Sequence, residues 1–114
     1  MDEVFEVTVE RRGDVPVVMA RGEVDVSTAP ALRTELLSVG DGAPFVVVDL
    51  SGVTFLDSTG LGALIAARGQ PGESDGLREL RLVVTRPQIR KVLEVTGLTS
   101  VFAVHDTLDA ALAT

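Results

Sequence analysis

Apolar and polar residues alternate at the start of the chain, which is the pattern of a half-buried strand. In residues 4–10, VFEVTVE, the side chains of Phe5, Val7 and Val9 lie on one face of an extended backbone. RRGD follows as a turn, and residues 16–20, PVVMA, form a second apolar run. The short link between the two runs predicts an antiparallel hairpin at the edge of a sheet.

The rest of the chain alternates short apolar runs with segments of helical periodicity. Strands are predicted over residues 45–50, 80–84 and 101–104, which are apolar and rich in β-branched residues. A helix is predicted after each of these strands, and one more helix precedes the strand at 45–50. The residues expected to face inward are Ala29, Leu32, Leu36 and Val39; Leu61, Leu64 and Ile65; Ile89, Val92, Leu93 and Thr96; and Leu108, Ala111 and Leu112.

Capping residues and breakers give the expected ends of these helices. Oxygen-bearing side chains accept hydrogen bonds from the first free N–H groups of a helix, and glycine often follows its last turn. The expected caps are Ser27 or Thr28 for the first helix, Asp57 or Ser58 for the second and Asp106 for the last. The third helix is expected to stop at Gly97. Polar loops are expected at GEVD (22–25) and GQPGESDG (69–76).

The order of elements is β-β-α-β-α-β-α-β-α. This order predicts one α/β domain over residues 1–114, with a mixed, mostly parallel sheet, an edge β-hairpin and about four helices that shield it. No internal repeat and no linker divides the chain. A hydrophobic content of 46% over 114 residues is typical of one packed domain of this kind.

Charge excludes several classes of partner. The net charge of −7 argues against nucleic acid and against an anionic membrane as the main partner, because both are themselves negative. No apolar run approaches the roughly 20 residues that span a bilayer. The acidic, alternating start is unlike a secretory signal, so a cytoplasmic protein is expected.

The sequence gives little indication of a metal site, a cofactor or an enzymatic activity. The chain has no cysteine and one histidine, His105, so no metal site and no cofactor are expected. A receiver domain phosphorylated on Asp49 would need a lysine after a late strand, but Lys91 falls inside a predicted helix. A small serine hydrolase using Ser58 and His105 stays a remote alternative, because the G-x-S-x-G pattern is absent. Arg86, Arg90 and Lys91 are interpreted as a solvated helix face.

The segment FLDSTGLG, residues 55–62, is the most unusual part of the chain. Asp57 or Ser58 could simply cap the following helix, but glycine at 60 and 62 costs helix stability and suggests that something approaches the backbone closely. Glu23 and Asp25 would share a rim of the sheet with Asp57 and Ser58. A phosphate added there would sharply raise like-charge repulsion.

The segments GEVDVSTAPALRTEL, FVVVDLSGVTFLDSTGLGAL and LRLVVTRPQIRKVLEVTGLTSVFAVHDTLDAAL together resemble a STAS-domain anti-anti-sigma factor, also called an anti-sigma factor antagonist. The resemblance implies a non-enzymatic protein that binds an anti-sigma factor serine kinase and thereby releases the sigma factor. It implies that this kinase phosphorylates Ser58, which ends binding, and that a PP2C-type phosphatase restores it. The partner-binding residues it implies are Glu23, Asp25, Asp57, Ser58, Thr59 and Gly60.

The segment at residues 69–76 departs from the family pattern. Relatives commonly have a longer helix after the serine and a basic turn, whereas residues 69–76 are acidic and contain a proline, so partner choice could differ. A STAS module that serves only as a scaffold in a signalling or transport assembly is the alternative function. Such a scaffold would bind its partners equally well with Ser58 altered.

Overall fold

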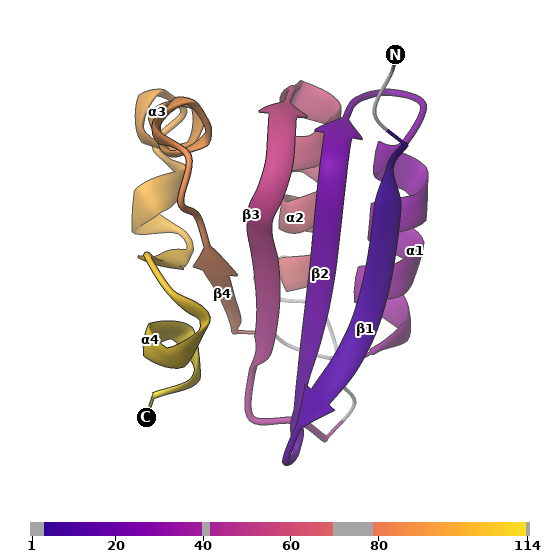
Figure 1. The fold of residues 1–114 in the computed structure, drawn as a ribbon, viewed down its shortest axis with the longest axis vertical. Coiled ribbons are helices and arrows are strands. Elements are labelled where there is room, and N and C mark those ends of the chain that lie inside the picture. Colours follow the sequence, from indigo (N-terminus) through magenta and orange to yellow (C-terminus); the bar gives the residue numbers. More distant parts are fainter. Residues whose placement is uncertain (1–3, 40–41, 70–78, 114) are drawn as a thin grey trace.

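Five strands form one mixed sheet in the order β1-β2-β3-β4-β5 (Figure 1). The computed structural model describes residues 4–39, 42–69 and 79–113. β1 and β2 form an antiparallel hairpin, and each later strand runs parallel to its neighbour. The predicted α/β fold with an edge hairpin is therefore confirmed. The strands are β1 (Glu6–Arg12), β2 (Val15–Val24), β3 (Val46–Leu56), β4 (Leu80–Val83) and β5 (Ala103–His105).

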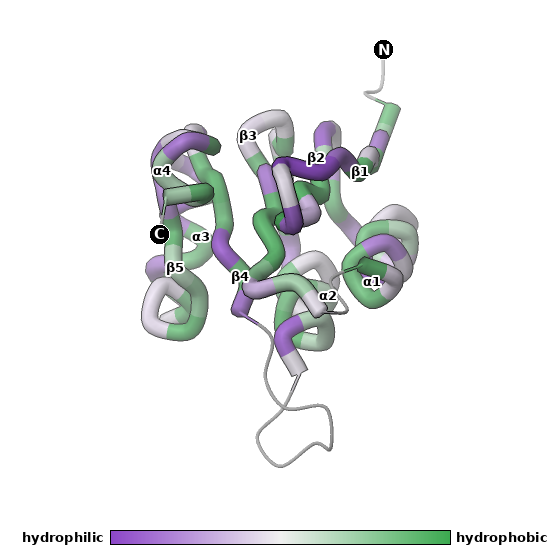
Figure 2. Tube along the Cα trace, turned by 90° about the horizontal axis from the view of Figure 1, so that it is seen from below, coloured by the Kyte–Doolittle hydropathy of each residue, from purple (hydrophilic) through white to green (hydrophobic). Residues whose placement is uncertain are grey.

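The helices cover the two faces of the sheet unequally. Figure 2 shows α1 and α2 on one side of the sheet and α4 on the opposite side. Buried residues of α3 join the same apolar cluster as those of α1 and α2, whereas α4 contributes to a smaller cluster on the other face. The helices are α1 (Ala29–Ser38), α2 (Ser58–Arg68), α3 (Pro87–Val95) and α4 (Leu108–Leu112), with a short 3-10 helix at Leu98–Ser100.

The central strand β3 explains how one apolar run serves both clusters. Val46, Val48 and Leu50 belong to the larger cluster, and Val47 to the smaller one. All four are at most 2% exposed. A strand covered on both faces needs apolar residues at successive positions, which is why this segment lacks the alternation of β1. Together the two clusters fix the strand that leads into the FLDSTGLG segment.

Two strands are longer than their sequence predicts. β2 continues from Ala20 to Val24, and β3 continues from Leu50 to Leu56. Glu23 and Val24 pair with the end of β3 beyond two shifts in register, and the φ of Gly22 is 96°. The prediction of a loop over residues 22–25 was therefore wrong for its first part. Parallel pairing between two distant segments stabilises a stretch whose glycine and acid are typical of a loop.

The inner faces of two helices differ slightly from the prediction. Ile65 was expected to face inward but is 37% exposed, because Ala63 and Ala67 share the buried side of α2 with Leu61 and Leu64. Thr96 was expected on the buried face of α3 and is instead exposed. It follows the helix, and its hydroxyl donates to backbone carbonyls of the last turn. The inward-facing residues predicted for α1 are confirmed, with Val39 partly buried.

The C-terminal elements are shifted from their predicted bounds. The 3-10 helix intervenes after α3, so β5 begins at Ala103 instead of residue 101. Thr107 caps α4, since its hydroxyl accepts from the Ala110 N–H at 3.0 Å. The prediction that Asp106 caps this helix was wrong, and Asp106 forms an ion pair with Arg90 instead. A one-residue choice between two capping side chains depends on backbone geometry that the sequence does not show.

The end of α2 agrees with the predicted break. The helix stops at Arg68, and Gly69 follows with a φ of 87°. A positive φ of this size favours glycine, because a Cβ atom would crowd the backbone there. The remainder of the predicted polar loop, residues 70–76, lies outside the described residues.

Candidate functional site

The carboxyl ends of β2 and β3 meet at one edge of the sheet and bring two aspartates together. The Asp57 N–H donates to the Val24 carbonyl at 3.2 Å, so Asp57 adjoins the residue that precedes Asp25. Glu23 pairs in register with Phe55 one step earlier. The predicted common rim of Glu23, Asp25 and Asp57 is therefore present. Residues separated by about thirty positions share this edge because parallel strands end on the same side.

The first turn of this rim, between β2 and α1, is closed by its own side chains. The Asp25 carboxylate accepts from the backbone N–H groups of Ser27 at 2.9 Å and of Thr28 at 3.2 Å. The Thr28 hydroxyl donates to the Glu23 carbonyl at 2.7 Å and accepts from the Asp25 N–H at 2.9 Å. Asp25 and Thr28 are both partly buried. This turn is a structural support for the rim.

The second turn, between β3 and α2, uses an aspartate as the helix cap. The Asp57 carboxylate accepts from the N–H groups of Thr59 at 2.9 Å and of Gly60 at 3.3 Å. The Thr59 hydroxyl donates to the same oxygen at 2.5 Å. That hydroxyl bond, with help from the two backbone bonds, lowers the pKa of Asp57 below its usual 3.8, although burial opposes the shift. Asp57 is therefore a carboxylate at neutral pH and a weak base.

The Ser58 side chain differs from both of its neighbours. Ser58 is the first residue of α2 and is exposed. Among the residues that the structure describes, none forms a hydrogen bond with its hydroxyl, whereas the Thr59 hydroxyl is held by Asp57. Two adjacent hydroxyls thus have different availability. The serine can be reached by a second protein, and the threonine already serves the cap.

Glycine is present at positions 60 and 62 for different physical reasons. Gly60 is buried, and a Cβ atom there would lie 2.8 Å from Val24 Cγ1 and would also collide with Leu56. Close approach at position 60 therefore comes from the protein's own sheet. Gly62 is exposed and a Cβ atom there would meet nothing within 4 Å. Its place inside the helix costs about 0.5–1 kcal/mol relative to alanine, with no internal packing to explain it.

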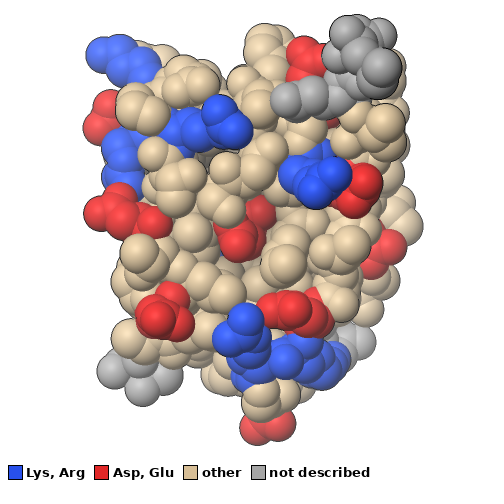
Figure 3. Space-filling model, in the orientation of Figure 1, with Lys and Arg blue, Asp and Glu red and all other residues tan. Residues whose placement is uncertain are grey.

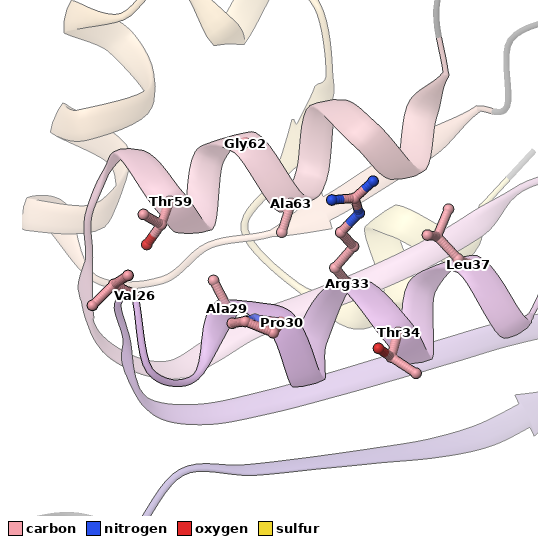
Figure 4. A pocket seen from close by; sticks show the side chains of 9 residues that line it. All are labelled: Val26, Ala29, Pro30, Arg33, Thr34, Leu37, Thr59, Gly62 and Ala63. Atoms are coloured by element: carbon pink, nitrogen blue, oxygen red, sulfur yellow. The ribbon is translucent and has the colours of Figure 1, made fainter.

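A surface groove of about 670 Å³ extends from this site between α1 and α2 (Figure 4). Thr59 and Val26 lie at one end of it, and Leu37 lies at the other. Val26 is 72% exposed and Leu37 is 51% exposed, which is unusual for apolar side chains that lie on one groove. Phe55, 47% exposed, is a further apolar side chain near the rim.

The predictions from sequence named the polar residues of this region and missed these apolar ones. Val26 is a single apolar residue between Asp25 and Ser27, and such a position is ordinarily interpreted as part of a polar loop. Phe55 precedes the buried Leu56, so alternation alone would have placed it on the outer face. That signal was available, but its meaning depended on knowing that β3 continues past Leu50.

The residues required for a serine hydrolase are not brought together. His105 is the last residue of β5 and pairs with Val83, a member of the smaller cluster on the α4 face. Ser58 starts α2, which packs on the opposite face of the sheet. The buried His105 Nε2 has no hydrogen-bond partner in the described part of the chain. In the same segments, no group of three or more potential ligands could hold a metal ion.

Basic side chains near α3 are accompanied by acids. Figure 3 shows blue atoms over α3 with red atoms beside them on this face. Arg90 forms an ion pair with Asp106, and Arg86 is the residue that precedes the helix. This arrangement fits a solvated helix face. None of the described helices has the length and apolar character needed to cross a membrane.

Comparison with known proteins gives the class of protein that this fold and rim define. The STAS domain model matches residues 6–111. The anti-sigma-B factor antagonist of Staphylococcus aureus is 32% identical over 90 residues, which cover 78% of this chain and 82% of that protein. The crystal structure of an anti-sigma factor antagonist from Mycobacterium paratuberculosis matches with a TM-score of 0.83 and 36% identity, covering 98% of this chain and 96% of that chain.

The chain therefore belongs to the STAS domain family and to the anti-sigma factor antagonists within it. The family resemblance noted from the sequence is confirmed. The phosphorylated form of SpoIIAA from Bacillus shares the fold, with a TM-score of 0.63 and 22% identity over 96% of each chain.

Proposed function

We propose that the unphosphorylated chain binds an anti-sigma factor that is also a serine kinase, and that a phosphate on Ser58 ends this binding. The observation that carries the proposal is the exposed Ser58 hydroxyl at the first position of α2, which bonds to none of the residues that the structure describes. The adjoining Thr59 hydroxyl is occupied by Asp57 at 2.5 Å, which favours Ser58 as the acceptor. In this role the chain is a substrate and a binding protein, and not an enzyme.

The transfer step needs a partner that supplies the nucleotide. The Ser58 oxygen attacks the γ-phosphorus of Mg²⁺-ATP held by the kinase, the new O–P bond forms, and the bond to ADP breaks. The hydroxyl proton passes to a base on the kinase, because the lowered pKa of Asp57 makes its carboxylate a weak base. This chain contributes the nucleophile and its position.

The site tolerates a phosphate in the free protein but not in the complex. At the start of α2 the helix dipole and the nearby N–H groups favour an anion. In the complex, about −1.5 to −2 units of added charge would have to lose water next to Asp57 and close to Asp25. A loss of about 1.4 kcal/mol already lowers affinity tenfold, so no refolding of the chain is required. A PP2C-type phosphatase that hydrolyses the phosphoserine would restore binding.

The remaining rim residues have supporting roles in this proposal. Asp25 and Thr28 hold the β2–α1 turn in place, and Glu23 adds exposed negative charge to the rim. Gly60 lets α2 start close to Val24 and Leu56, which sets the position of the serine above the sheet edge. The partner would therefore meet a surface whose shape is fixed before binding.

Phosphate transfer and affinity test the proposal together. The wild-type chain, Ser58→Ala and Ser58→Glu are incubated with Mg²⁺-ATP and the anti-sigma factor from the same genome, and their intact masses are measured. The affinity of each unphosphorylated chain for the same anti-sigma factor is measured separately by calorimetry, without ATP. One phosphate on the wild type, none on Ser58→Ala, and an affinity for Ser58→Glu at least about tenfold below wild type are expected.

Two results would contradict the proposal. A phosphate that still appears on Ser58→Ala would place the acceptor elsewhere. Equal affinity of the wild type and Ser58→Glu would leave a scaffold that binds without a phosphate switch.

A further inference from the structure

The groove between α1 and α2 has the features of a binding surface that continues from the Ser58 site. Its Thr59 end adjoins Ser58, so a protein that covers Ser58 also reaches the mouth of the groove (Figure 4). Val26, at that end, and Leu37, at the far end, are the apolar side chains that remain most exposed on it. A partner that covered both would remove apolar surface from water at each end of the groove.

Gly62 keeps the α2 wall of the groove low. A Cβ atom at this position would point into space that no other group occupies within 4 Å. The internal packing that explains Gly60 does not apply at Gly62. Glycine inside a helix where nothing internal needs it is explained if a second backbone or side chain approaches from outside.

Arg33 supplies the charge of the groove. It is the cationic residue among those that line it, and its guanidinium points from α1 toward the α2 side (Figure 4). The ion pairs found among the described residues involve Arg12, Arg21, Arg81 and Arg90, and leave Arg33 without a carboxylate partner. In a chain with a net charge of −7, such a cation next to apolar side chains is complementary to an acid on another molecule.

We propose that the groove receives a short segment of the anti-sigma factor that carries one apolar side chain and one carboxylate. The apolar side chain lies over Gly62 toward the Val26 end, and the carboxylate pairs with Arg33 farther along the groove. The acids at the rim, Asp25 and Asp57, repel a carboxylate and so orient the segment with its acid away from Ser58. This inference rests on the proposed function, because it assigns part of the surface used by the same partner.

The groove contact and the Ser58 contact then have separate tasks. The groove lies along the helices and its charged contact is made by Arg33, whereas the phosphate would act at the helix start. The groove therefore supplies affinity and selects partners that carry an acid at the right distance from the kinase site. The serine alone decides whether the complex persists.

Charge reversal in the groove provides the test. Arg33→Glu and, as a matched control, Arg11→Glu are titrated calorimetrically with the anti-sigma factor from the same genome. Both variants change the net charge equally, but Arg11 lies exposed on β1, away from the groove. We expect Arg33→Glu to weaken binding by about tenfold to a hundredfold and Arg11→Glu by no more than about threefold.

Filling the groove is the second arm. Gly62→Leu is expected to weaken binding by about tenfold or more, and Gly62→Ala by a smaller factor, while neither lowers the melting temperature. Ser58→Glu is measured beside them. If Ser58→Glu loses affinity while the Arg33 and Gly62 variants bind like wild type, the groove assignment is wrong and the phosphate switch stands.

The opposite results are equally distinct. If the Arg33 and Gly62 variants bind weakly while Ser58→Glu binds like the wild type, the proposed phosphate switch is wrong. The groove then remains a docking surface for the anti-sigma factor. Sedimentation of the chain alone as a dimer that Arg33→Glu dissociates would assign the groove to a second copy and overturn the proposal. If the wild-type chain does not bind the anti-sigma factor at all, both the proposed function and the proposed occupant of the groove are wrong.

Discussion

The two turns at the carboxyl edge of the sheet are built from nearly the same residues, DVSTA at 25–29 and DSTG at 57–60. Each has an aspartate that accepts from two backbone N–H groups and a threonine whose hydroxyl contacts that aspartate. In the first turn the threonine also ties the carbonyl of Glu23, and the serine stands before the helix. In the second turn, one residue shorter, the serine is the first residue of α2.

The two serines therefore differ in their place relative to the helix start, and the proposed phosphorylation of Ser58 depends on that place. Ser27 and Ser58 are both exposed serines close to an aspartate. Only Ser58 occupies a helical position where free N–H groups and the dipole favour a phosphate. The roles of the two turns also differ, since the first turn supports the rim and the second exposes the Ser58 side chain.

The largest expected contrast is in phosphate incorporation. Incubated with the anti-sigma kinase and ATP, Ser27→Ala should gain one phosphate like the wild type, and Ser58→Ala should gain none. The physical reason is that Ser58 is the first residue of α2, whereas Ser27 stands before α1. Intact-mass spectrometry measures the result, and a phosphate on Ser27 would break the distinction between the turns.

The next contrast concerns the residue after each threonine, Ala29 in the first turn and Gly60 in the second. Gly60→Ala should destabilise the fold by about 1–3 kcal/mol, because the added methyl group overlaps Val24 and Leu56. Gly62→Ala is the matched control and should stabilise it by about 0.5–1 kcal/mol. Urea unfolding of both variants measures this, and equal stabilities would mean that Gly60 is not held by internal packing.

A smaller contrast is expected between the two threonines. Thr28→Val should lower the free energy of unfolding by about 1–2 kcal/mol, since it removes the bond to the Glu23 carbonyl and the acceptor for the Asp25 N–H. Thr59→Val removes one exposed bond to Asp57 and should cost less. Denaturant unfolding ranks the variants. A larger loss at Thr59 would reverse the structural roles assigned to the two turns.

The smallest effect is the dependence of stability on pH through Asp57. Its pKa is lower in the folded chain than the usual 3.8, so the unfolded chain takes up the proton first as the pH falls. The contribution of this carboxylate is therefore complete above about pH 4–5 and is lost below pH 3.8 as the pH passes through the folded-state pKa. The difference in unfolding free energy between wild type and Asp57→Asn should shrink over that range. If the difference in unfolding free energy between wild type and Asp57→Asn does not change with pH, the Thr59 hydroxyl bond does not stabilise the charged form of Asp57.

Much of the fold follows from local pattern. The alternation of β1, the continuous apolar run of β3 and the helical spacing of Ala29, Leu32 and Leu36 each predict the element that is present. The errors at the ends of β2 and β3 share a cause. The ends of β2 and β3 are strands because each pairs with the other, and a window along one segment contains no information about its partner.

The candidate site was predictable to a similar extent. The local sequence pattern indicated Asp25, Asp57 and Ser58, because caps, hydroxyls and acids at strand ends have strong local signatures. The resemblance to the family added Thr59. The three-dimensional structure was needed to show which glycine internal packing requires and which hydroxyl bonds to none of the described residues. It also showed that a groove lined by Arg33 runs between α1 and α2. Those properties depend on contacts between segments far apart in the chain, and no local preference specifies them.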